Sequence, residues 1–186
     1  MFLFYKKKKK ILFNFFLTIY SYAWTIPLTY IYDHDSQVRR TWFDFDKKSI
    51  SVSAPIETKW LKFNSHQVGF YRVNYEVEMW QEIIKDLVET PAKFAIADRA
   101  HLLNDIFSLA DANQVSYEVA LDMTTYLSKE NDFVPWSVAT SKLQALQGNL
   151  IFTDSYMDYL QYARGLVSKV YQQVTWNVDE DKHLKK

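Results

Sequence analysis

The stretch VGFYRVNYE, residues Val68–Glu76, lies where the sequence changes from an alternating pattern to a helical one. One set of alternate positions is aromatic or apolar: Tyr71, Val73 and Tyr75. Arg72 and Asn74 lie between them, and this period of two is that of a β-strand with two different faces. Gly69 supplies a turn between this run and WLKFN at 60–64. The pattern predicts a β-hairpin whose tyrosines face a core, while Arg72 and Asn74 point the other way.

Upstream of this hairpin the chain is predicted to form further strands. Three segments between Trp24 and Ile56 are rich in β-branched and aromatic residues or alternate apolar with polar: WTIPLTYIY, TWFDFD and SISVSAPI. The links DHDSQ and DKKS are typical of turns, because Asp and Ser side chains can bond their own backbone. Residues 24–75 therefore contain short strands joined by polar turns.

Beyond Glu76 the period becomes helical. In ADRAHLLNDIFSLADAN, residues 97–113, one side of the predicted helix is apolar: Leu102, Leu103, Ile106, Phe107, Leu109 and Ala110. The other side is polar: Asp98, His101, Asn104, Asp105 and Ser108. We therefore expect an amphipathic helix with one buried face.

Similar helices are predicted at 77–89, 116–128, 135–150 and 153–174, with Ser116 as a helix cap and Gly148 near the end of the fourth helix. Five helices joined by short polar links favour antiparallel hairpins stacked as in a helical solenoid. The expected fold class is α+β, mostly α, with a HEAT-like α-superhelix after the strands.

Composition excludes several classes of function. The 22 Lys and Arg residues balance 22 Asp and Glu residues, so no net charge favours nucleic acid as a partner. Cysteine is absent, which excludes a thiolate metal site and a cysteine nucleophile. Only three glycines occur, and loops that cradle phosphates need glycine for close backbone approach.

The first 23 residues differ from the rest. Five lysines at 6–10 precede an uncharged run at 11–32, a pattern typical of a signal peptide or membrane anchor. The run is long enough for a spanning helix but is diluted by polar residues and Pro27. A translated noncoding stretch is a further interpretation of residues 1–23. If the signal or anchor interpretation holds, we expect residues 11–32 to associate with a membrane.

A resemblance follows from longer segments. The segments WTIPLTY, WLKFNSHQVGFYRVNYE, ADRAHLLNDIFSLADAN with its continuation to VPW at 134–136, and LVSKVYQQVTW resemble successive parts of the zinc metalloaminopeptidase family. That family includes aminopeptidase N, glutamyl aminopeptidase and the endoplasmic reticulum aminopeptidases. The resemblance runs from about Trp24 to Trp176. It implies that 24–75 correspond to the end of a β-sandwich domain and 76–186 to the first part of the C-terminal α-superhelical domain.

The resemblance implies a non-catalytic part of an aminopeptidase. In the family this helical domain caps the catalytic domain and encloses the cavity for peptides, whose N-terminal residues are removed. The family's chemistry needs His-Glu-x-x-His for Zn²⁺, and its Gly-x-Met-Glu-Asn segment holds the substrate amine. Neither motif occurs here. We therefore expect no catalytic residue, metal ligand or cofactor in this chain. The resemblance also implies that the protein is localised to the plasma membrane, the extracellular space or the secretory pathway.

Candidate site residues are few. Asp98, His101 and Asp105 lie on one helix face, so a metal site is conceivable, although a solvated surface is the favoured interpretation. Arg72 is a candidate to bind a peptide carboxylate, or else to pair between the strands and the helices. Asp98 and Arg99 are expected to serve helix initiation and contacts with a neighbouring helix. The residues expected to have a structural role are Gly69, Tyr71, Arg72, Asn74, Tyr75, Asp98 and Arg99.

Two hypotheses of different kinds remain. In the first, the chain is part of a zinc aminopeptidase and has the missing catalytic domain as its intramolecular partner. In the second, it is a free-standing helical module that binds a peptide or protein. The N-terminal segment of that module could also attach it to a membrane. Solenoids offer concave surfaces for such binding. Unpaired strand edges count against the second hypothesis, because exposed edges promote aggregation.

Overall fold

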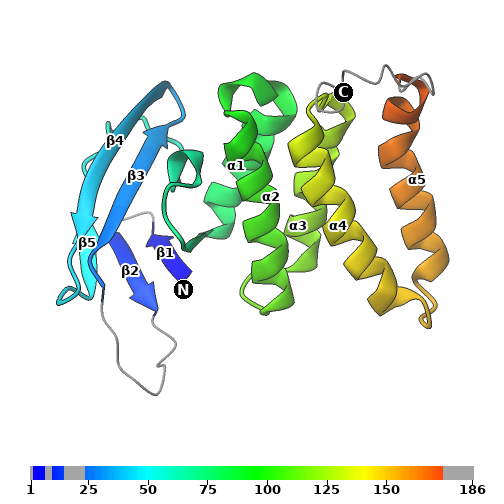
Figure 1. Cartoon of the computed structure of the whole chain (residues 1–186), viewed down its shortest axis with the longest axis horizontal. Coiled ribbons are helices and arrows are strands. Elements are labelled where there is room, and N and C mark those ends of the chain that lie inside the picture. The colour runs from blue at the N-terminus through cyan, green and yellow to red at the C-terminus, as the bar shows by residue number, and fades with distance from the viewer. Residues whose placement is uncertain (1, 7–9, 15–23, 174–186) are drawn as a thin grey trace, which may run out of the picture.

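The computed structural model describes residues 2–6, 10–14 and 24–173. Strands lie at one end of an elongated molecule, and the helices follow them side by side in nearly sequential order (Figure 1). The sequence-based expectation of an α+β, mostly α fold is confirmed. One hydrophobic core runs through both parts, from Ile26 on the first long strand to Tyr159 on the last helix.

One sheet has three antiparallel strands in the order β4-β3-β6. These are β3 (Ile26–Tyr32), β4 (Asp35–Phe43) and β6 (Leu61–Phe63). The central strand β3 is buried along its whole length except at Pro27. Strand β6 is buried at all three of its positions, including the lysine at its centre. This sheet therefore places a charged side chain inside the protein.

The second sheet has the strand order β5-β2-β1-β7. It consists of β1 (Phe2–Lys6), β2 (Lys10–Asn14), β5 (Ser49–Ser51) and β7 (Arg72–Tyr75). Strand β1 is parallel to β7 and antiparallel to β2. The predicted hairpin between 60–64 and 69–76 is therefore wrong, because β6 and β7 belong to different sheets. A 3-10 turn, η1 (Ser65–Gln67), redirects the chain between them.

The N-terminal segment contributes strands within the described ranges. Residues 2–6 and 10–14 form β1 and β2, and residues 26–32 form β3, so strands occupy both ends of the uncharged run at 11–32. Residues 15–23, part of the stretch interpreted as a signal peptide or membrane anchor, lie outside the described residues. Within the described part of the chain, no helix has the length and apolar character needed to cross a membrane.

The helices agree with the predicted ones apart from their ends. They are α1 (Val77–Glu89), α2 (Ile96–Asp111), α3 (Tyr117–Thr124), α4 (Phe133–Leu150) and α5 (Tyr156–Gln173). Short 3-10 helices, η2 (Pro91–Lys93) and η3 (Thr125–Lys129), follow α1 and α3. Ser116 caps α3, since its hydroxyl accepts a hydrogen bond from the Val119 amide at 3.4 Å. Gly148 lies inside α4 rather than at its end.

Helix α2 differs from its prediction in having two buried sides. The polar residues Asp98, His101 and Asp105, expected on a solvated surface, are all buried. The physical reason is position: α2 packs on α3 and α4 with one side, and on η1 and β7 with the other. Asn74 is also buried, and its side-chain oxygen accepts a hydrogen bond from the indole of Trp80 on α1 at 3.0 Å.

Candidate functional site

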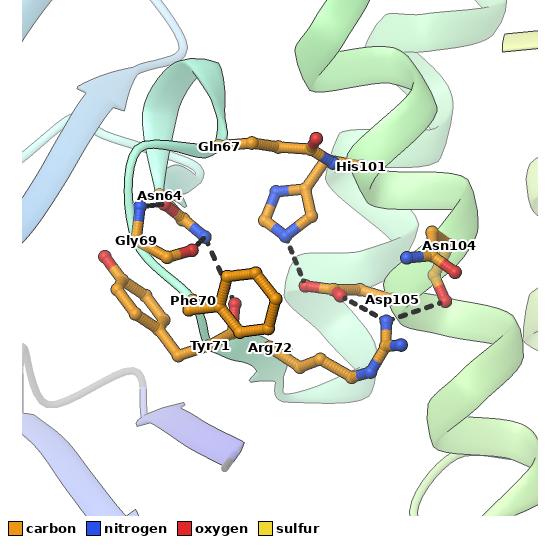
Figure 2. Close-up of a pocket in the computed structure, with 9 residues that line it drawn as sticks. All are labelled: Asn64, Gln67, Gly69, Phe70, Tyr71, Arg72, His101, Asn104 and Asp105. Carbon is orange, nitrogen blue, oxygen red and sulfur yellow. Dashed lines mark hydrogen bonds and ion pairs between the residues drawn. The ribbon is translucent and has the colours of Figure 1, made fainter. Parts of the chain in front are cut away.

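A group of charged residues lies between the strands and α2. Strands β6 and β7 and the loop that joins them face α2, and a hollow of about 340 Å³ opens at this junction (Figure 2). Five charged or titratable side chains meet beside it, and we call this set the seam: Lys62, Arg72, Asp98, His101 and Asp105. Four of the five are buried, and Arg72 is the partly exposed one.

Lys62 and Asp98 form a buried ion pair between β6 and α2. The Lys62 ammonium donates to the Asp98 carboxylate and, at 2.8 Å, to the Asn64 carbonyl. The same carboxylate oxygen accepts the His66 backbone amide at 2.7 Å. Burial lowers the pKa of Lys62, and the charge of Asp98 opposes that change. The pair therefore fixes η1 and β6 to the first turn of α2.

His101 connects the two halves of the seam. Its Nδ1 lies 3.3 Å from the Lys62 Nζ, and its Nε2 lies 3.0 Å from a carboxylate oxygen of Asp105. An ammonium group can only donate, so this geometry assigns Nδ1 as the acceptor and places the proton on Nε2. The imidazole is then neutral and donates to Asp105. With a neutral His101, the two positive charges of the seam equal its two negative charges in number.

Asp105 receives donors on both of its oxygens. Arg72 Nη1 lies 3.1 Å from Oδ1, and the Val73 backbone amide donates to Oδ2 at 2.9 Å. Arg72 also donates to the Asn104 carbonyl at 3.4 Å. Figure 2 shows the Arg72 side chain extended along the hollow toward Asp105 on α2. Arg72 thus pairs between strand and helix, while its side chain stays 35% exposed.

The loop before β7 is held in an unusual conformation. Asn64, His66 and Gln67 have left-handed backbone angles, with φ of 55°, 58° and 56°. The Asn64 side chain accepts the Gly69 amide at 2.8 Å and donates to the Gly69 carbonyl at 2.8 Å. A Cβ on Gly69 would lie 2.1 Å from a ring carbon of Tyr71, so this close approach needs glycine. The loop thereby presents the side chain of Phe70, which is fully exposed.

The metal interpretation of Asp98, His101 and Asp105 does not fit this geometry. Each carboxylate is already bound to a side-chain cation, and the free nitrogen of His101 points at the Lys62 ammonium. A metal ion here would meet that positive charge at close range. Among the residues that the structure describes, no group of three His, Asp or Glu side chains is arranged to hold a metal.

Arg99 forms a second buried ionic cluster on another side of α2. Its guanidinium donates to both oxygens of Glu130, at 2.7 and 3.1 Å, and to the Phe94 carbonyl at 2.8 Å. Glu130 also accepts the backbone amides of Asn131 and Asp132. Consecutive residues Asp98 and Arg99 thus tie α2 to the strands and to the loop before α4. Asp98 also lies in the first turn of α2, where a carboxylate suits the helix dipole.

Sequence reasoning missed Lys62 in the seam, its neighbour Asn64, and the partners of Arg99, Glu130 and Asp132. A signal for Lys62 existed, because it lies between Leu61 and Phe63 in an otherwise apolar strand. No comparable signal marks Asn64 or Glu130, whose partners are remote in the sequence or are backbone groups. Their roles depend on the loop geometry.

Comparison with known proteins agrees with the fold. Residues 60–186 match the model of the ERAP1-like C-terminal domain. The chain is 33% identical to glutamyl aminopeptidase of Sus scrofa over 175 residues, 91% of this chain and 18% of that protein. Human glutamyl aminopeptidase is 34% identical over 169 residues, 89% of this chain and 17% of that protein.

A relative with a different name shares the same segment. Thyrotropin-releasing hormone-degrading ectoenzyme of Rattus norvegicus is 30% identical over 159 residues, 84% of this chain and 15% of that protein. The chain thus spans less than a fifth of the length of these curated relatives. The chain belongs to the ERAP1-like C-terminal domain family of the aminopeptidases.

Proposed function

We propose that this chain is the non-catalytic scaffold of a zinc-dependent aminopeptidase that removes N-terminal residues from peptides. In that enzyme the helices would cap the catalytic domain and enclose the peptide cavity, and the catalytic domain would be the partner of this chain. The family match and the relatives named as aminopeptidases support the proposal. The zinc would be bound by another part of the enzyme, since the His-Glu-x-x-His motif does not occur in this sequence.

The observation that carries the proposal is the seam. Its ion pairs join β6 and β7 to α2, and each of the two carboxylates accepts two donors from the strand side. Buried pairs of this kind tolerate little change of geometry, because a separated partner remains as an uncompensated charge. The seam would therefore hold the helices at a fixed angle to the β region. A helical region held in this way would suit the role of a cap over a catalytic cavity.

The test is a chimeric enzyme. The segment of pig glutamyl aminopeptidase that aligns with this chain is replaced by this chain, and release of an N-terminal glutamyl residue from a chromogenic substrate is measured. We expect hydrolysis by the chimera and none by the isolated chain. A matched chimera with Lys62→Met should lose activity in parallel with its melting temperature. A chimera that folds normally but has no activity would refute the scaffold role.

The length of the natural product gives an independent check. An antibody against residues 166–176 is used to probe a denaturing gel of tissue extract. A band several times heavier than 22.1 kDa supports the proposal, because it shows these helices attached to a larger enzyme. A band near 22 kDa favours the second hypothesis, a free-standing helical module that binds a peptide or protein.

A further inference from the structure

The hollow beside the seam has unused hydrogen-bonding groups on its walls. Arg72 uses only its Nη1 for Asp105 and Asn104. Among the described residues, its Nε and Nη2 have no hydrogen-bond partner, and neither do the side-chain amides of Gln67 and Asn104. All three side chains line the same hollow. A guanidinium group with two free donors in a fixed plane matches the geometry of a carboxylate.

Phe70 adds an apolar surface to the same place. Its ring is fully exposed at the rim, and Val68 on the same loop is 64% exposed. Phe70 and Arg72 both line the hollow and are labelled in Figure 2. Phe70 and Val68 thus offer an apolar contact surface beside the guanidinium of Arg72.

The loop that carries Phe70 is fixed before any ligand arrives. Three left-handed residues and the two hydrogen bonds from Asn64 to Gly69 hold its shape. Left-handed backbone at residues other than glycine costs free energy and concentrates at ligand-binding segments. Asp105 holds Arg72 in place from behind, and both of its oxygens are already occupied. The rim and the guanidinium are thus both preorganised, which lowers the entropic cost of binding.

From these observations we infer that the hollow binds a peptide carboxylate next to an apolar side chain. Arg72 would receive the carboxylate on its free Nε and Nη2, and Gln67 and Asn104 would donate from their amides. Phe70 would contact the neighbouring apolar group. The carboxylate can come from a peptide C-terminus or from an internal glutamate, and the same chemistry recognises both. The site consists of this chain's own residues, so its test is independent of any catalytic domain.

The experiment titrates the full chain, labelled with ¹⁵N, with N-acetylated peptides and follows the Arg72 Nε–H signal by NMR. The probes are Ala-Ala-Ala-Leu as the free acid, its C-terminal amide, and an amidated Ala-Glu-Leu-Ala. We expect the free acid to bind about tenfold more tightly than its amide, the difference that one charge-assisted pair provides. Tight binding of the amidated glutamate peptide instead would assign the site to internal acidic residues.

Three variants separate binding from folding. Arg72→Lys keeps the charge but loses the planar fork, and it should reduce the preference for the acid. Phe70→Ala leaves every hydrogen bond of the seam intact. It should weaken binding of the peptide that ends in leucine about fivefold, and it should not weaken binding of one that ends in glycine. Arg164→Gln, an exposed change on α5, should alter neither. Equal binding of acid and amide, binding of no peptide, or an unchanged preference in Arg72→Lys would each overturn the inference.

Discussion

Asp98 and Arg99 are neighbours in α2, yet their side chains enter two separate buried ionic clusters. Asp98 pairs with Lys62 on β6, and Arg99 pairs with Glu130 in the loop before α4. Because successive helical residues diverge by about 100° around the axis, one dipeptide can join α2 to elements on two sides. The first turn of α2 thus links the β region to the helical region.

Breaking the Lys62–Asp98 pair should be strongly destabilising. Lys62→Met leaves the buried Asp98 carboxylate without its ammonium partner, and the expected loss is about 3–5 kcal/mol of unfolding free energy. The double variant Lys62→Met with Asp98→Leu should lose less than the two single losses combined. Urea denaturation of all four proteins checks this. A single variant within about 1 kcal/mol of the parent would contradict it.

Arg99 should not tolerate lysine. Arg99→Lys keeps the charge but cannot bind both oxygens of Glu130 while donating to the Phe94 carbonyl. We expect a loss of about 1–3 kcal/mol, since buried acceptors are left unsatisfied. Arg164→Lys on the exposed surface of α5 is the matched control and should change stability by less than about 0.5 kcal/mol. Equal midpoints for the two variants in urea would show that the fork of Arg99 is dispensable.

Replacing Gly69 or Gly148 by alanine should change the stability of the protein in opposite directions. In Gly69→Ala the new methyl group meets the Tyr71 ring at 2.1 Å, and this ring is buried, so we expect a loss of about 1–3 kcal/mol. Gly148 lies inside α4, and beyond its own helical backbone and chain neighbours an added Cβ would meet nothing within 4 Å. Gly148→Ala should therefore stabilise the protein by about 0.5–1 kcal/mol. Thermal melts followed by circular dichroism compare the two variants with the parent. A melting temperature that falls in both variants would refute the predicted stabilisation by Gly148→Ala.

Stability should fall steeply at alkaline pH. Burial raises the pKa of Tyr71, Tyr75 and Tyr126 above their ordinary value of 10.0. Below pH 10 these phenols are neutral in both states. Above it the unfolded chain ionises first and binds fewer protons than the folded chain, so the free energy of unfolding decreases as pH rises.

Tyr126→Phe tests the alkaline effect at one site. The Tyr126 hydroxyl lies near Glu130 but makes no hydrogen bond of good geometry, so its removal should cost little at pH 7. Urea unfolding at pH 7 and pH 10.5 should show a smaller decrease for the variant than for the parent. An identical pH dependence would mean that this phenol ionises equally in both states.

The sequence sufficed where an element depends on local period or capping. The helices were predictable because apolar residues recur at helical spacing, and the cap of α3 was predictable because Ser116 bonds an amide three residues away. The family was recognisable for a related reason, since its segments keep their order along the chain.

Pairing between remote segments was not predictable in the same way. Strands β6 and β7 are close in sequence, but the left-handed turn at Asn64 sends them into different sheets. Asp98, His101 and Asp105 have the spacing of a solvated helix face, and nothing local distinguishes them from one. They are buried because a second layer, β7 and η1, covers that side of α2.

The sequence by itself thus determined the presence of short strands between 24 and 75, the order of the five helices and the family. Periodicity and capping act over a few residues, which is why one chain is enough to reveal them. The tertiary structure decided which charges are buried and which groups stay free. Arg72, Gln67 and Asn104 come together only when β7 docks on α2, and that docking depends on ion pairs between residues more than 30 positions apart.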